Sequence, residues 1–134
     1  MVSIGDDPRV TSNAYHVLML QYHAEAFGGA SRERFLAAMR AEGIDGLHSG
    51  YSLPVYRQPV LLAENFGLAT PPLFSGVYPH KPDYRQVHCP VTDRVCDTEA
   101  VWVRQSMLLG ERQDMDDIVT AMAKIQSHSD ELQE

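Results

Sequence analysis

The chain has 134 residues, the usual length of one domain of about 100–150 residues. Hydrophobic residues make up 44% of it and charged residues 22%, which excludes a disordered or fibrous protein. The formal net charge of -7 disfavours a nucleic-acid or anionic-membrane partner, because such partners favour clustered Lys and Arg. We therefore predict one folded domain over residues 1–134, with no nucleic acid and no membrane among its partners.

Targeting signals and cysteine content bear on where the protein resides. The first residues include Asp6 and Asp7, where a secretory signal would need a basic segment and a long apolar stretch. Interior apolar runs such as residues 17–20 are far shorter than the roughly 20 residues that cross a bilayer. Two cysteines, Cys89 and Cys96, are too few to be the main staple of the domain. We expect a cytoplasmic protein, and the sequence leaves open a single disulfide between the two thiols.

The first predicted elements are a strand and a helix. Strand-forming residues over 14–22 place apolar side chains on both parities, which indicates a strand covered on both faces or a central one. Ser31 is a suitable N-cap for a helix over 32–42, and Gly43 is predicted to close that helix as its C-cap. The apolar face of this helix is formed by Phe35, Leu36 and Met39.

A short strand is predicted over 44–48, and residues 49–96 are predicted to be mostly loop. Proline and glycine recur throughout this long segment. A connection of this length without its own periodicity is uncommon in a compact domain unless it binds a ligand or packs against a partner. We therefore expect the functional surface to lie in it.

The rest of the sequence predicts a short helix over 97–100, a strand over 101–109 and a final helix near 115–130. The strand begins with β-branched and aromatic residues, and Asp114 is a suitable N-cap for the final helix. Together these elements predict an α+β fold, in which helices pack on a small mixed or antiparallel sheet. The apolar stripe of the final helix is formed by Met115, Ile118, Val119, Met122 and Ile125.

Four side chains between residues 80 and 96 raise the question of a zinc site. His80, His88, Cys89 and Cys96 are of the ligand types that zinc prefers, but their spacing is not the paired one of structural sites. A cysteine nucleophile would need a base within hydrogen-bond reach, which the adjacency of His88 and Cys89 does not provide. The spacing favours loop histidines and structural thiols, so we assign neither a metal site nor a catalytic residue.

The loop over residues 50–59 is the best candidate for ligand binding. Tyr51, Tyr56 and Arg57 offer two hydroxyl donors and a cation on a proline-stiffened segment, which suits a polar or anionic ligand. The alternative is a surface loop whose tyrosines pack on a neighbouring element.

The order of motifs along the chain carries a resemblance. The run from Phe27 to Ile44 is followed by Gly50-Tyr51 with Pro54-Val55-Tyr56, then by Cys89-Pro90, Trp102 and the strand that ends at Gly110, and by the segments 114–118 and 121–125. This order resembles the carboxy-terminal part of the DegT/DnrJ family of pyridoxal-phosphate-dependent sugar aminotransferases, over nearly the whole chain.

The resemblance implies the small domain of a fold-type-I aminotransferase, with a larger cofactor domain absent from this chain. Three features of the family's cofactor site precede the matched region. They are the lysine that forms the internal aldimine, the acidic residue against the pyridine nitrogen and the cup for the phosphate. The two lysines, Lys81 and Lys124, do not match the family's lysine position. The resemblance therefore implies a transaminase that uses pyridoxal phosphate when intact, with no cofactor and no catalysis expected of this chain alone.

The resemblance also implies a substrate and a site. The family lines its active site opposite the cofactor with the loop that contains Tyr51, Tyr56 and Arg57 here, and many members have a histidine where this chain has Tyr56. The substrate would be a keto-sugar or cyclitol, including nucleotide-sugars, and the protein would be a homodimer. A stand-alone binding or assembly module derived from such a domain remains the alternative.

Overall fold

The structure has an antiparallel sheet at its centre. The computed structural model describes residues 2–3, 8–64, 71, 74–77, 79–80 and 82–133. The sheet is four-stranded in the order β1-β2-β4-β3, and every neighbouring pair is antiparallel. The strands are β1 (Val2–Ser3), β2 (Val17–Gln21), β3 (Leu47–His48) and β4 (Ala100–Arg104). The predicted α+β class is confirmed, and the short strand β1 was not predicted.

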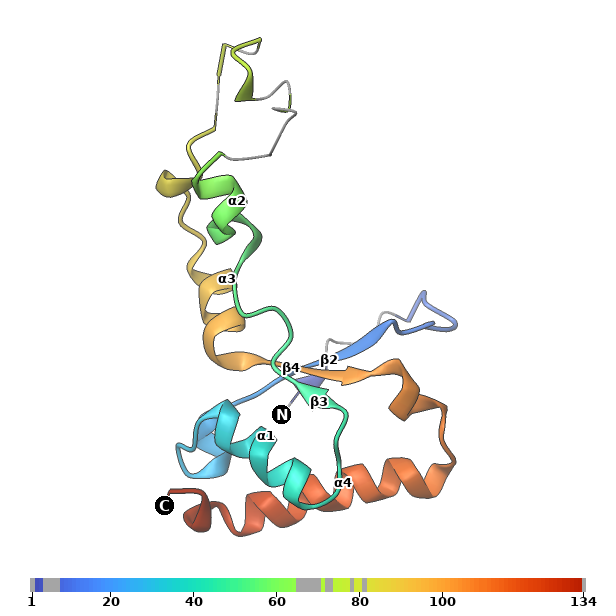
Figure 1. Cartoon of the computed structure of the whole chain (residues 1–134). Coiled ribbons are helices and arrows are strands. Elements are labelled where there is room, and N and C mark those ends of the chain that lie inside the picture. The colour runs from blue at the N-terminus through green and yellow to red at the C-terminus, as the bar shows by residue number, and fades with distance from the viewer. Residues whose placement is uncertain are drawn as a thin grey trace.

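Helices pack on one side of this sheet and extend away from the other (Figure 1). The helices are α1 (Arg32–Ala41), α2 (Pro59–Leu62), α3 (Pro90–Arg94) and α4 (Arg112–Ser127). Shorter 3-10 turns span Ala24–Phe27, Val55–Arg57, Tyr84–Gln86, Gln105–Leu109 and Ser129–Gln133, and a π turn spans Val95–Glu99. In Figure 1, α1 and α4 lie below the strands, whereas α2 and α3 project above them. We call the described residues of 51–99 the arm.

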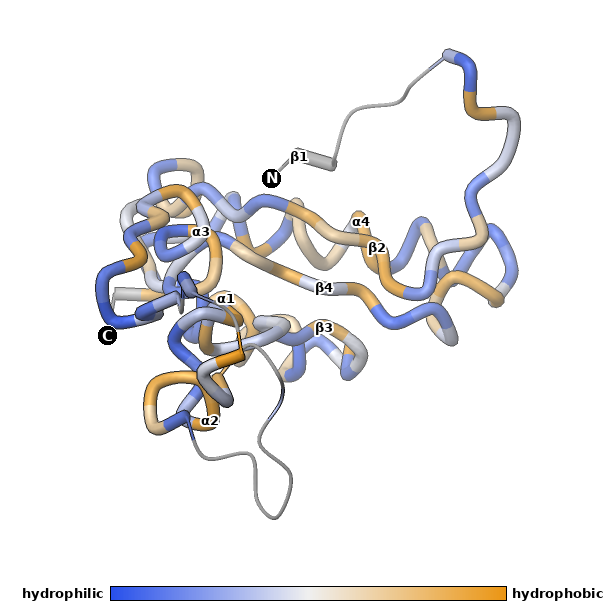
Figure 2. Tube along the Cα trace, turned by 90° about the horizontal axis from the view of Figure 1, so that it is seen from above, coloured by the Kyte–Doolittle hydropathy of each residue, from blue (hydrophilic) through white to orange (hydrophobic). Residues whose placement is uncertain are grey.

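The side chains of β4 alternate between the two faces of the sheet, and their burial shows which face α1 and α4 cover. Val101 and Val103 are 0% and 2% exposed and pack in one cluster with side chains of α1 and α4. Trp102 points to the opposite face, because successive strand side chains alternate. Seen from above, β2 and β4 run side by side over α4 (Figure 2). The face that carries Trp102 is therefore the one from which the arm rises.

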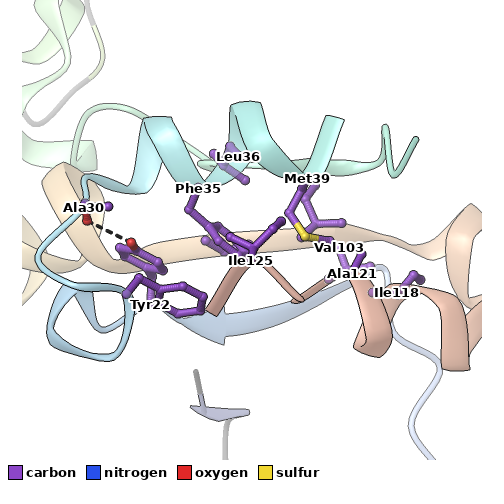
Figure 3. Packing of buried hydrophobic residues seen from close by; sticks show 12 residues of the cluster. Tyr22, Ala30, Phe35, Leu36, Met39, Val103, Ile118, Ala121 and Ile125 are labelled. Atoms are coloured by element: carbon purple, nitrogen blue, oxygen red, sulfur yellow. Dashed lines mark hydrogen bonds between the residues drawn. The ribbon is translucent and has the colours of Figure 1, made fainter. Parts of the chain in front are cut away.

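Three aromatic rings form one end of the core (Figure 3). Tyr22, Phe27 and Phe35 have ring centroids 4.9–5.2 Å apart. The Tyr22 hydroxyl donates a 2.8 Å hydrogen bond to the carbonyl of Ala30, so this buried polar group is paired. Burial of Tyr22 raises the pKa of its hydroxyl, and the charge of Glu33 adds to this. Truncation of a buried Phe such as Phe35 typically costs about 3–5 kcal/mol, so these rings are central to stability.

The predicted first helix is confirmed with its N-cap. The Ser31 side chain accepts a hydrogen bond from the backbone N–H of Arg34, as a capping serine should. The C-cap is Glu42 rather than Gly43. Gly43 follows it with a φ of +86°, the left-handed conformation that glycine adopts at the end of a helix.

The predicted strand over 101–109 is wrong in its second half. The sheet partner β2 begins at Val17, which pairs with Arg104, so no strand continues beside the chain beyond that residue. The next residues coil into a 3-10 turn, and Met107 and Leu108 pack against the core instead. The residue types of 105–109 favoured a strand, but β4 ends at Arg104, where its partner β2 begins.

The final helix begins earlier than predicted. Its N-cap is Glu111, and Asp114 is the third residue of the helix. The two form a reciprocal capping box, in which the Glu111 backbone N–H donates to Asp114 Oδ2 at 2.7 Å. The prediction of Asp114 as the N-cap is therefore wrong, although Asp114 does cap the first turn from the third position of the helix.

The predicted long loop contains helical segments. Pro59 and Pro90 each occupy the first turn of a short helix, where the missing N–H of proline costs nothing. Of the predicted helix over 97–100, residues 97–99 lie in the π turn that follows α3, and Ala100 begins β4. No helix within the described ranges is both long and apolar enough to cross a membrane.

Candidate substrate-binding site

The loop that enters the arm is shaped by glycine and proline. Gly50 has a φ of +70°, and its backbone N–H donates to His48 Nδ1 at 3.2 Å. Pro54 precedes the 3-10 turn Val55–Arg57, and its carbonyl accepts from the Arg57 backbone N–H at 3.0 Å. This turn presents Tyr56 and Arg57 toward α3.

Tyr56 and Arg57 converge on one carboxylate of α3. The Tyr56 hydroxyl donates a short hydrogen bond to Asp93 Oδ1. Arg57 Nη1 lies 3.3 Å from the same oxygen and 3.5 Å from Asp97 Oδ2. We call Tyr56, Arg57, Asp93 and Asp97 the arm cluster.

The contacts of the arm cluster set its protonation. The Tyr56 hydrogen bond, followed by that of Arg57, holds the pKa of the Asp93 carboxyl below its usual range. The same bond to Asp93 raises the pKa of Tyr56, and the two carboxylates raise that of Arg57. At neutral pH Tyr56 is thus a neutral donor, Asp93 is ionised, and one guanidinium is shared between two carboxylates. The cluster as a whole is negatively charged.

Tyr51 lies in a different set of contacts. Its ring meets Trp102 edge-on, with centroids 5.1 Å apart and an interplanar angle of 79°. His48 meets the same indole at 5.7 Å and 63°. Tyr51 is nonetheless 73% exposed. The three predicted site residues therefore divide, with Tyr51 on Trp102 and the other two on Asp93.

A groove of about 300 Å³ lies where the arm meets the uncovered face of the sheet. Glu99 in its wall accepts hydrogen bonds from Arg94 Nε at 2.7 Å and Gln21 Nε2 at 2.9 Å. These polar groups are thus paired with one another, and the rest of the lining is largely apolar. The lining is formed by Met19, Leu20, Gln21, Val91, Arg94, Val95, Glu99, Ala100 and Trp102.

The candidate metal ligands and the two thiols do not come together in a site in the part of the chain that the structure describes. Among the described residues, no three His, Cys, Asp or Glu side chains are grouped so that they could hold a metal ion. Cys89 and Cys96 are free thiols, each half-buried.

The lysines bear on whether pyridoxal phosphate fits this chain. Lys124 Nζ lies 2.8 Å from both carboxylate oxygens of Glu42 and ties α4 to α1. This ion pair is exposed. Lys81 lies outside the described residues. The lysine that the structure describes is therefore paired with a carboxylate rather than presented to a cofactor.

The acidic half of the arm cluster was not predicted. Asp93 and Asp97 are four residues apart, a spacing that places two side chains on one face of a helix. Pro90 at the start of a helix would have been the signal for that spacing, but the segment was interpreted as loop.

Comparison with known proteins relates the chain to aminotransferases. No family model matches it. It is 32% identical over 129 residues to a putative L-glutamine:3-amino-2,3-dideoxy-scyllo-inosose aminotransferase of Streptoalloteichus tenebrarius, covering 95% of this chain and 30% of that protein. Proteins with the same name are 30% identical over 128 residues in Streptomyces kanamyceticus, with shares of 96% and 30%, and 29% identical over 127 residues in Micromonospora echinospora, with shares of 93% and 29%. The chain thus spans about 30% of the length of these curated relatives.

Proposed function

We propose that this chain is the small-domain portion of a pyridoxal-phosphate-dependent aminotransferase of the DegT/DnrJ kind that acts on a cyclitol ketone. The observation that carries the proposal is the match of nearly the whole chain to three proteins named as aminotransferases. Residues 1–134 form one domain in this proposal, and the large cofactor domain belongs to the rest of the enzyme. The electron-sink chemistry that pyridoxal phosphate supplies when bound lies with that rest.

In the proposal, this chain binds and orients the substrate through Tyr51, Tyr56 and Arg57. The Tyr56 hydroxyl donates its single proton to Asp93 Oδ1, so its oxygen is left to accept a hydrogen bond from a hydroxyl or ammonium group of the substrate. Tyr51 offers an exposed hydroxyl on a ring that Trp102 supports. The hydrogen bond to Asp93 raises the pKa of Tyr56, which moves it away from the range in which a histidine exchanges protons, so we assign Tyr56 to binding rather than to proton transfer.

The charge of the arm cluster favours an amino-substituted cyclitol over a nucleotide-sugar. Arg57 is shared by two carboxylates, so it is a poor site for a diphosphate. A substrate amino group is cationic at neutral pH and suits a negatively charged cluster. The relatives are named for such a compound, a 3-amino-2,3-dideoxy-scyllo-inosose.

We further propose that the protein is a homodimer that pairs through the arm. Large exposed apolar patches usually find a partner, and a two-fold pair is the commonest closed arrangement. The exposed large apolar side chains of the arm are Val55, Val60, Leu62, Val77, Val87 and Val91.

A chimera tests the proposed function. The matched segment of the Streptomyces kanamyceticus relative is replaced by this chain, and amino transfer from L-glutamine to the amino-inosose is measured. We expect turnover, with a KM for the cyclitol that rises about five- to tenfold in Tyr56→Phe, because a hydrogen bond to a charged group is lost. Tyr84→Phe is the matched control, since this arm tyrosine packs near Phe74 rather than on a carboxylate.

The chimera also separates the competing function. A folded chimera that binds pyridoxal phosphate but gives no turnover, beside an active parent, would contradict the aminotransferase role. Tight binding of a small molecule by this chain alone would then favour the stand-alone binding module.

A further inference from the structure

Arg32 is a buried charge at the root of the arm. It is the first residue of α1, and only 6% of its surface is exposed. Its guanidinium donates to Glu33 Oε1 at 3.0 and 3.1 Å. A buried arginine is costly unless its donors are paired, so the position of its partners matters.

The remaining partners of Arg32 are backbone carbonyls of the π turn that follows α3 and of Ala100, the first residue of β4. Nη1 donates to the carbonyls of Cys96 at 3.0 Å and Ala100 at 3.3 Å, and Nη2 donates to that of Asp97 at 3.0 Å. Carbonyls at the C-terminal end of a helix lack intrahelical donors and carry partial negative charge. Arg32 thus binds the backbone of the segment in which the π turn of the arm passes into β4.

The same turn holds the arm cluster. The Asp97 carbonyl binds Arg32, while the Asp97 carboxylate pairs with Arg57. One helical turn earlier, Asp93 accepts from Tyr56 and Arg57. We call the sheet with α1 and α4 the body. An unbroken set of contacts therefore runs from α1 in the body to the Tyr56 hydroxyl in the arm.

We infer that Arg32 is a positioning residue that fixes the direction in which the arm leaves the sheet, and with it the placement of Tyr56 and Arg57. Its role for a substrate rests on the proposed function, whereas its role in arm direction does not. The fork of a guanidinium can hold two carbonyls of the π turn and the first carbonyl of β4 at once, and a lysine ammonium on its flexible stem cannot hold them in the same rigid geometry. The other contacts described at the arm root lie at its two ends: Tyr51 meets Trp102, and Glu99 accepts hydrogen bonds from Gln21 Nε2 at 2.9 Å and from the Tyr22 backbone N–H at 2.7 Å.

Residual dipolar couplings of the 15N-labelled chain test the inference, because they report the orientation of each helix directly. In the natural protein, one alignment tensor should fit α1, α4, β2 and α3. In Arg32→Ala, we expect the N–H couplings of α3 to fall about twofold or more below the values that the tensor fitted to α1, α4 and β2 requires, while the couplings of those three elements stay mutually consistent. Arg32→Lys should give an intermediate loss. Arg40→Ala on the same helix is the control, since Arg40 Nε donates to the Leu36 carbonyl within α1.

Two results would overturn the inference. Either α3 keeps the tensor and amplitude of the body in both Arg32 variants, or Arg40→Ala reorients α3 as much as they do. If Arg32→Ala does not fold, Arg32→Lys decides the question alone. An inactive chimera with unchanged couplings in the natural chain would count against the proposed function and not against the role of Arg32 in arm direction.

Discussion

Gly50 lies against the indole ring of Trp102. A Cβ atom at Gly50 would lie 2.6 Å from Trp102 Cε2, and the φ of Gly50 is +70°. Only glycine therefore fits without strain where the chain leaves β3 to enter the arm. The indole also contacts the ring of Tyr51 edge-on. The absence of a side chain at Gly50 therefore allows the indole to lie where it contacts Tyr51, the next residue and a candidate binding residue.

The first prediction follows from this contact. Gly50→Ala should lower the free energy of unfolding by about 2–4 kcal/mol, because a left-handed conformation and a steric clash both oppose the new methyl group. Urea unfolding followed by the fluorescence of Trp102, the single tryptophan, measures this. Gly43→Ala is the matched control, since Gly43 has a φ of +86° and nothing within 4 Å of its Cβ position. An equal loss in both variants would show that the indole contact contributes nothing.

The second prediction concerns pH. Because the folded pKa of Asp93 is lowered, the unfolded chain takes up this proton first as the pH falls. The stabilisation that Asp93 contributes is therefore complete above its usual value of 3.8 and is lost as the pH falls through the folded pKa. Carboxyl 13C titration should give an Asp93 pKa below 3.8, and this pKa should rise in Tyr56→Phe.

Tyr51→Phe serves as the control for that titration. The Tyr51 ring contacts Trp102, so removal of its hydroxyl should leave the Asp93 titration unchanged. An Asp93 pKa at or above the usual value in the unmodified chain would contradict the hydrogen bond from Tyr56.

The third prediction concerns the start of α4. Asp114→Ala should cost about 1 kcal/mol, because it removes half of the capping box and a carboxylate from the positive end of the helix. Asp117→Ala, three residues further along the same helix, should cost only a few tenths of that amount, since its carboxylate accepts only from Gln113. Thermal unfolding of both variants provides the comparison, and similar losses would argue against the capping box.

The sequence predicted those elements whose signals are local. Ser31 and the spacing of Phe35, Leu36 and Met39 were sufficient to predict α1, because a cap and an apolar face lie within one turn of the residues they describe. The end of β4 depended on where β2 begins, which is a pairing between residues far apart in the chain. No window around residues 105–109 contains that information.

The candidate site shows the same division. Tyr51, Tyr56 and Arg57 could be selected from residue type and loop composition alone. That Asp93 and Asp97 neutralise Arg57 could not, because those contacts join residues 36 or more positions apart. The expectation of an anionic ligand arose from a cation considered without its partners.

The fourth prediction concerns the lysines. Borohydride reduction of this chain with pyridoxal phosphate should give no stoichiometric pyridoxyl adduct on Lys81 or Lys124, and no turnover of an amino donor. Lys124 Nζ is engaged by both carboxylate oxygens of Glu42 on the surface, and the resemblance gives neither lysine the family's lysine position. The chimera, which contains the relative's remaining sequence, is the positive control. A stoichiometric adduct on either lysine, together with turnover, would overturn the proposed division of labour between the domains.

The fifth prediction concerns association through the arm. Light scattering at micromolar concentration should give about twice the chain mass of 15.0 kDa, as for a two-fold pair. Val91→Glu should shift the mass to that of one chain, because Val91 is 61% exposed on α3 and a buried carboxylate would oppose the interface. Val119→Glu is the matched control, since Val119 is 64% exposed but lies on α4 in the body. An unmodified chain that stays at 15.0 kDa would contradict the dimer. A dimer that dissociates in Val119→Glu but not in Val91→Glu would place the interface on α4.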